Sequence, residues 1–132
     1  MPEKRTLKRA ARDRRQGKAA STQAGEFVRE EIEHIREGKH GARSTKQAIA
    51  IGLSKARRAG VKLRPPRKGT TSKQTCRRAQ RDYARGQRGS AAKPSPRRSR
   101  ASLRRLKREG RAAGSRQALS RQAKQAARRR AA

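Results

Sequence analysis

The stretch STQAGEFVREEIEHIREGKHGARSTKQAIAIGLSKARRAGVKL, residues 21–63, decides the predicted fold. Its first part, residues 21–38, has the apolar period of an α-helix. Ser21 or Thr22 is the expected N-cap, and Gly38 suits the left-handed position after a helix end. The apolar residues that share one face are Ala24, Val28, Ile32 and Ile35, with Phe27 at the margin. Residues 21–38 are therefore predicted to form a two-faced helix.

A second helix is predicted over residues 44–60. Ser44 and Gln47 have the spacing of a capping box, which marks a helix start. The apolar stripe consists of Ile49, Leu53 and Ala56. Gly52 lies beside it and costs roughly 1 kcal/mol against alanine in a helix interior, so we expect a neighbouring backbone to approach there. Two amphipathic helices with a short connector predict an αα-hairpin that buries both stripes.

Short segments flank the hairpin. Residues 4–16 predict a highly charged helix that ends at Gly17, and Val61 and Leu63 are expected to fold back as a hydrophobic cap before the prolines at 65 and 66. Ile51 points away from the stripe of its helix. Two interpretations stay open for it: contact with the first helix or with residues 61–63, and a homodimer interface through the hairpin.

Charge separates the two halves of the chain. The 132 residues carry 41 Lys and Arg against 9 Asp and Glu, a formal net charge of +32. Residues 1–66 have a net charge of +11, and residues 67–132 have +21. Only 30% of the residues are hydrophobic, which cannot build a large core. We therefore expect an all-α fold: a small helical hairpin with a short N-terminal helix, then a largely disordered basic C-terminal half containing short helices.

The expected organisation has four parts. These are a basic N-terminal arm (1–20), the hairpin (21–64), a basic Pro/Gly/Ser linker with a short helix (65–101) and a basic helical tail (102–132). Residues 8–21 align without gaps to 77–90, and residues 35–49 echo 106–119, which raises the hypothesis of an ancestral duplication. Residues 102–109 and 115–130 keep caps and helix formers but few large apolar residues, so they are expected to form full helices only on a partner.

Residues 26–63 resemble a family of short basic bacterial and phage proteins of unknown function. The resemblance is carried by KQAIAIGLSKAR at residues 46–57, which matches the pattern K-Q-A-I-A-I-[GA]-L-S-x-A-R. The C-terminal KREGRAAGSRQALSRQAK, residues 107–124, is similar to the histone-like Arg- and Ala-rich tails of some such proteins. The resemblance implies DNA association and brings no catalytic residues.

The basic residues point to a polyanion. Residues 95–98, Ser-Pro-Arg-Arg, match an element of minor-groove binders, against the alternative of a plain linker. The RPPRKG segment at 64–69 has some character of an AT-hook but lacks the central Arg-Gly-Arg-Pro. The expected function is DNA binding without sequence specificity, through phosphates. The candidate nucleic-acid-binding residues are Lys46, Lys55, Arg57, Arg58, Arg64, Arg67, Lys68, Arg97, Arg98, Arg104, Arg105, Arg128, Arg129 and Arg130.

Two other functions stay open. A basic tail does not distinguish duplex DNA from structured RNA, so an RNA- or ribosome-associated protein is one alternative. The other is a protein-interaction or assembly factor that works through Ile51 and an acidic row. That row is otherwise a solvated face or a docking site for the basic arms. It comprises Glu26, Glu30, Glu33 and Glu37.

Enzymatic, cofactor and metal functions are not expected. His34 and His40 have only the distant Cys76 as a third candidate ligand, which is not a zinc spacing. The single cysteine fits a reducing compartment. No apolar run reaches the roughly 20 residues of a membrane span, and the N-terminus lacks a signal-peptide pattern. The expected location is the cytoplasm, at the nucleoid.

Overall fold

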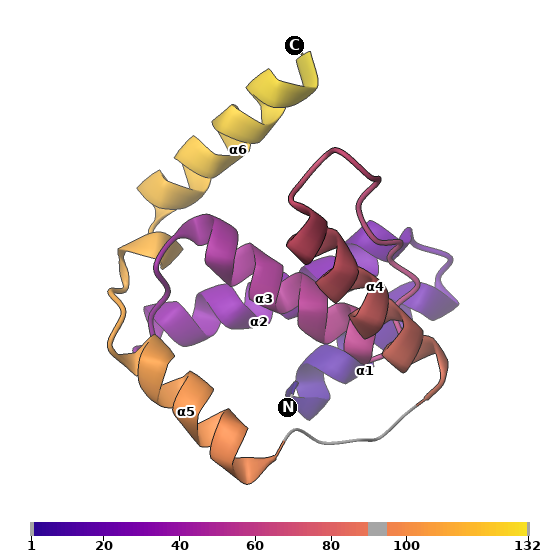
Figure 1. The fold of residues 1–132 in the computed structure, drawn as a ribbon, viewed down its shortest axis with the longest axis horizontal. Coiled ribbons are helices and arrows are strands. Elements are labelled where there is room, and N and C mark those ends of the chain that lie inside the picture. The colour runs from indigo at the N-terminus through magenta and orange to yellow at the C-terminus, as the bar shows by residue number, and fades with distance from the viewer. Residues whose placement is uncertain (1, 90–94, 132) are drawn as a thin grey trace. The chain divides into compact units, whose positions relative to one another are not determined.

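The computed structural model describes residues 2–89 and 95–131, and within these residues it contains helices and connecting segments but no strand (Figure 1). The all-α part of the prediction is therefore confirmed. The α-helices are α1 (Lys4–Arg15), α2 (Ala20–Arg36), α3 (Thr45–Arg58), α4 (Lys73–Gln87), α5 (Pro96–Lys107) and α6 (Arg116–Ala131), and a 3₁₀ turn, η1 (Ala112–Gly114), precedes α6.

The prediction of a largely disordered C-terminal half is wrong. Helices α4, α5 and α6 occupy most of the described residues from Lys73 onward. Each begins with a serine cap: the hydroxyls of Ser72, Ser95 and Ser115 accept from the backbone N–H groups of Thr75, Arg98 and Ala118. The prediction failed because it looked for large apolar residues, whereas backbone hydrogen bonds hold much of this half.

The chain divides into two compact units. We call Met1–Glu30 with Ile51–Ala92 the first unit, and Glu31–Ala50 with Lys93–Ala132 the second unit. Helices α2 and α3 contribute residues to both units, α1 and α4 lie in the first, and α5 and α6 lie in the second.

The first unit contains an apolar core between the start of α2 and the end of α3. The buried cluster comprises Ala10, Ala24, Phe27, Ala56 and Val61, with Ala20, Leu53 and Leu63 packed against it. Because residues 24 and 27 meet residues 53 and 56, the two helices run antiparallel, which confirms the hairpin. Phe27 lies at the centre, 1% exposed, and not at the margin of the stripe.

Gly52 confirms the expected close approach of a neighbouring backbone. A Cβ atom built there would lie 2.6 Å from the Cα of Val28, which is inside van der Waals contact. Gly86 likewise allows α4 to approach the backbone of α3, because a Cβ atom there would overlap the carbonyl of Arg57. Small residues therefore let two helix pairs of the first unit pack at backbone distance.

Helix ends follow the sequence with one exception. Gly17, Gly38 and Gly60 have positive φ angles of 72°, 78° and 99° just after α1, α2 and α3, as expected. The Ser44 hydroxyl accepts from the Gln47 N–H, which confirms the N-terminal cap of α3. Helix α2 begins earlier than predicted, at Ala20, so Ser21 and Thr22 lie inside its first turn and do not cap it.

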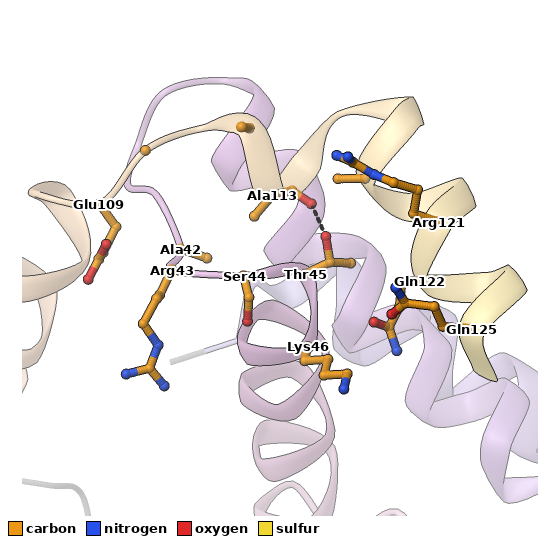
Figure 2. Close-up of a pocket in the computed structure, with 13 residues that line it drawn as sticks. Ala42, Arg43, Ser44, Thr45, Lys46, Glu109, Ala113, Arg121, Gln122 and Gln125 are labelled. Atoms are coloured by element: carbon orange, nitrogen blue, oxygen red, sulfur yellow. Dashed lines mark hydrogen bonds between the residues drawn. The ribbon is translucent and has the colours of Figure 1, made fainter. Parts of the chain in front are cut away.

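In the second unit, side chains of one segment donate hydrogen bonds to backbone carbonyls of another segment. The Arg111 guanidinium donates to the carbonyls of Ile35, at 3.1 Å, and Arg36, and so caps the C-terminus of α2. In return Arg36 Nε donates to the carbonyl of Gly114, at 2.8 Å. The Thr45 hydroxyl donates to the carbonyl of Ala113, at 2.7 Å (Figure 2). These bonds tie η1 to the end of α2 and to the start of α3.

The connector before α3 also pairs with the last turn of α5 and with the connector before α6. The N–H of Gly41 donates to the carbonyl of Leu106, at 2.8 Å, and the N–H of Ala42 donates to that of Gly110, at 3.0 Å. These are the segments that echo each other in the sequence. No helix among the described residues has the length and apolar character needed to cross a membrane.

Candidate nucleic-acid interface

Positive and negative side chains are segregated between the surface and the interior. Among the described residues, every Lys and Arg is exposed except Arg9 and Lys55, which are partly buried, and Arg57, which is buried. Of the nine acidic residues, only Glu37 is exposed, and the others are buried or partly buried. The ratio of positive to negative side chains is therefore higher on the surface than in the whole sequence.

The buried carboxylates bind groups of the chain itself. Asp13 of α1 is 2% exposed and lies 3.3 Å from the ammonium of Lys18. Glu30 of α2 accepts from the Thr6 hydroxyl, at 3.0 Å, and from the Glu3 backbone N–H, at 2.6 Å. Glu30 thus holds the start of α1 against α2. Carboxylates that are buried and bonded in this way repel an external polyanion less than exposed carboxylates would.

The acidic row on α2 is not a solvated face. Glu30 is buried, Glu26 and Glu33 are partly buried, and only Glu37, 3.3 Å from Lys39, is exposed. At Glu30 the N-terminal arm contacts the row through the Thr6 hydroxyl and the Glu3 backbone N–H. Ile51, the other residue of the proposed interaction surface, is partly buried.

Helix α1 has a basic face that was not among the predicted site residues. Its buried residues, Thr6, Ala10 and Asp13, share one side of the helix. The cations recur at helical spacing on the opposite side, and all of them are exposed. They are Lys4, Lys8, Arg12 and Arg15.

Helix α4 repeats this arrangement. Cys76 and Ala79 are buried on one side, and Asp82 is partly buried with its carboxylate 3.9 Å from Arg58. The opposite side has exposed cations at four-residue spacing: Lys73, Arg77, Arg81 and Arg85. The alignment of residues 8–21 with 77–90 pairs the single aspartate of α1 with that of α4. Because each aspartate lies opposite the exposed cations, the alignment indicated both basic faces.

Arg57 was predicted to contact DNA and instead stabilises the fold. Its Nε donates to the carbonyl of Leu63, at 3.2 Å, and its Nη2 donates to that of Arg64, at 3.3 Å. Desolvation by burial lowers the pKa of the Arg57 guanidinium, while the nearby Asp82 carboxylate raises it. Arg57 therefore secures the segment that follows α3 and is not available to a phosphate.

The other predicted residues of the first unit lie on the surface or close to it. Lys55 is partly buried, while Arg58 is exposed at the end of α3 with its Nε bonded to the carbonyl of Ser54. Arg64, Arg67 and Lys68 are exposed in the extended segment between α3 and α4, which includes a turn closed by the Thr70 N–H on the Arg67 carbonyl.

The Ser-Pro-Arg-Arg element at 95–98 is neither a free turn nor a linker, since Ser95 caps α5 and Pro96 is its first residue. The predicted arginines of the second unit are all exposed. Arg97, Arg98, Arg104 and Arg105 lie on α5, and Arg128, Arg129 and Arg130 lie in the last turn of α6.

The second unit also has an open groove of about 510 Å³ between the start of α3 and α6 (Figure 2). Of the predicted residues, Lys46 lines it. Sequence reasoning missed its other cations, Arg43 and Arg121, and the amides of Gln122 and Gln125. Cations and amide donors around an open groove suit phosphate oxygens.

The chain belongs to a family of unknown function, DUF6496, whose model matches residues 3–69. The match includes all of α1, α2 and α3, and it is wider than the stretch from which an uncharacterised family was inferred. No curated protein and no solved structure shows significant similarity to the chain.

Proposed function

We propose that the protein binds duplex DNA through its phosphates, with little sequence preference, as a histone-like protein of the nucleoid. The segregation of charge carries this proposal: only one of the nine carboxylates, that of Glu37, is exposed, while almost all the described cations are exposed. Duplex DNA has one negative charge per roughly 1.7 Å of its axis, and cations that neutralise it release counterions. The resemblance to short basic bacterial and phage proteins supports the same class.

The supply of aromatic side chains favours binding to duplex phosphates over binding to single strands. Phe27, the only phenylalanine, is buried in the core, and the only tyrosine, Tyr83, is partly buried. Single-strand binding relies on exposed aromatic side chains on which bases stack. The exposed guanidinium groups are suited to phosphate contact.

Salt dependence tests the electrostatic mechanism. With about 6 to 10 phosphate contacts, the affinity for duplex DNA should fall roughly 10³- to 10⁵-fold between 50 and 200 mM salt. Fluorescence anisotropy with two duplexes of unrelated sequence measures this, and the two curves should coincide. Affinity that does not respond to salt contradicts the proposal. A structured RNA that competes better than the duplex would favour the RNA alternative.

The basic face of α4 gives a matched test. The double variant Arg77→Gln/Arg81→Gln removes two exposed cations, so the slope of log K against log salt should become shallower by about 2 units. The control Gln74→Ala/Gln80→Ala changes two neighbouring uncharged side chains of the same exposed helix and should leave the slope unchanged. Equal slopes for both double variants would show that α4 does not contact the duplex.

A further inference from the structure

Two histidines and a glutamate meet within the second unit. Glu31 and His34 lie on α2, and His40 lies in the connector that follows it. Each residue offers one ligand atom, and the three atoms lie within 4.8 Å of one another. Glu31 is 0% exposed and His40 is 8% exposed, whereas His34 is partly buried. The His34 and His40 rings are edge to face, with centroids 5.9 Å apart.

The hydrogen bond of His40 fixes its tautomer. Its Nδ1 lies 2.9 Å from the carbonyl oxygen of Gly41. A carbonyl oxygen only accepts, so Nδ1 has the proton and the neutral ring has its lone pair on Nε2. That Nε2 faces a carboxylate oxygen of Glu31 at 3.3 Å. A cation shared by this lone pair and the carboxylate, such as a metal ion, would stabilise the pair.

We propose that Glu31, His34 and His40 bind Zn²⁺. Zinc bonds of about 2.0–2.1 Å in a tetrahedron place neighbouring ligand atoms about 3.3–3.4 Å apart, and Nε2 of His40 lies 3.3 Å from Glu31. A proton joins only these two groups, whereas a metal ion also uses the nearby His34. Imidazole ligands favour zinc over Ca²⁺ and Mg²⁺, which prefer oxygen.

The surroundings match those of metal-binding histidines. Such histidines almost always donate their second ring N–H to a carbonyl or carboxylate, as His40 does to Gly41. The buried Glu31 supplies the negative charge that a dication needs in so basic a chain. The sequence argument against a metal considered only Cys76 as the third ligand and overlooked the glutamate three residues before His34.

Zinc at this site would stiffen the second unit. The ion would join α2 to the connector, and the next two residues of that connector, Gly41 and Ala42, donate to the carbonyls of Leu106 and Gly110. Hydrogen exchange at these two amides should slow when zinc binds, since opening the connector would then require loss of the metal.

The experiment uses the full-length chain without a histidine tag and free of nucleic acid. Zinc is titrated by calorimetry and cobalt by visible absorption, after treatment with a chelator. One equivalent is expected to bind. His34→Gln should weaken binding at least roughly 10- to 100-fold, because the loss of even an indirect metal contact has such an effect. His34 is partly buried, so circular dichroism should show an intact fold; Glu31→Gln and His40→Gln should weaken binding as well.

Two control variants keep the test specific. Cys76→Ser removes the only thiol, which lies in the first unit, and Glu37→Gln removes the exposed carboxylate that directly follows α2. Both should bind zinc like the wild type. If the wild type binds no zinc, or if His34→Gln binds it equally well, then these three side chains do not form a zinc site and the proposal is wrong. Loss of binding in Cys76→Ser would overturn it too.

Discussion

The two compact units are stabilised by different kinds of contact. The first has an apolar cluster around Phe27, a residue that the side-chain period had placed only at the margin of the stripe. In the second unit, guanidinium, hydroxyl and backbone donors bind carbonyls, as Arg111 does at the end of α2 and Thr45 does at η1. A segment poor in large apolar residues can therefore be ordered when its polar groups satisfy the backbone of another segment.

The largest effect should come from the apolar core of the first unit. Phe27→Ala removes a side chain that is 1% exposed and leaves a cavity, which typically costs about 3–5 kcal/mol. This is a large part of the roughly 5–15 kcal/mol that stabilises a small protein. Urea unfolding followed by circular dichroism measures the loss. Leu7→Ala, at a position 41% exposed, is the control and should change stability by less than about 0.5 kcal/mol.

The second unit should respond most to a change that separates its paired connectors. The Cβ atom of Gly41→Ala would overlap the carbonyl oxygens of Glu109 and Gly110, so the connectors must move apart. We expect a loss of about 1–3 kcal/mol, with faster hydrogen exchange at the Ala42 amide. Gly110→Ala meets no atom within 4 Å and is the matched control. If the two variants have equal stability, the connector pairing does not hold the second unit together.

The comparison also shows what the sequence could predict. Helix ends at Gly17, Gly38 and Gly60, the hairpin and the close approach at Gly52 follow from local rules about caps, periodicity and glycine. The contacts of Arg111 do not follow, because an arginine in a basic segment gives no sign that its partner is a carbonyl 75 residues away.

The candidate site shows a similar limit. Most of the predicted contact residues are exposed, but the sequence could not separate the buried Arg57 from its neighbours Lys55 and Arg58. Arg57 differs from them because it is buried and donates hydrogen bonds to the carbonyls of Leu63 and Arg64. The sequence repeat could have predicted the cationic faces of α1 and α4. The single aspartate of each helix lies on its buried or partly buried side, so the cations on the opposite side face solvent.

Alanine in place of two helical glycines tests packing in the first unit. At Gly52 the new methyl group would meet the Val28 backbone, so the overlap should exceed the roughly 1 kcal/mol gained in helix propensity. We expect a net loss of about 1–2 kcal/mol. At Gly25 of α2 nothing lies within 4 Å, so Gly25→Ala should stabilise the protein by about 0.5–1 kcal/mol. Opposite signs in thermal unfolding support the packing; equal signs would contradict it.

The smallest effect should come from Arg111→Lys in the second unit. Lysine keeps the charge but lacks the planar fork that reaches both the Ile35 and Arg36 carbonyls, so one carbonyl returns to water. Because Arg111 is exposed, the loss should be about 0.5–1 kcal/mol, near the net value of one hydrogen bond. The control Arg108→Lys, at the exposed C-cap of α5, changes no carbonyl contact of α2.

Hydrogen exchange gives the decisive measurement for Arg111. Protection should fall at the amides of Gly41, Ala42 and Gly114, whose bonds lie within the second unit, and remain unchanged at Gly60 and Val61 in the first. If Arg111→Lys loosens the first unit instead, or if both lysine variants behave like the wild type, then carbonyl capping by Arg111 does not order the C-terminal half. The few apolar residues of the second unit, Ile32, Ile35 and Ala48, would then have to supply its stability.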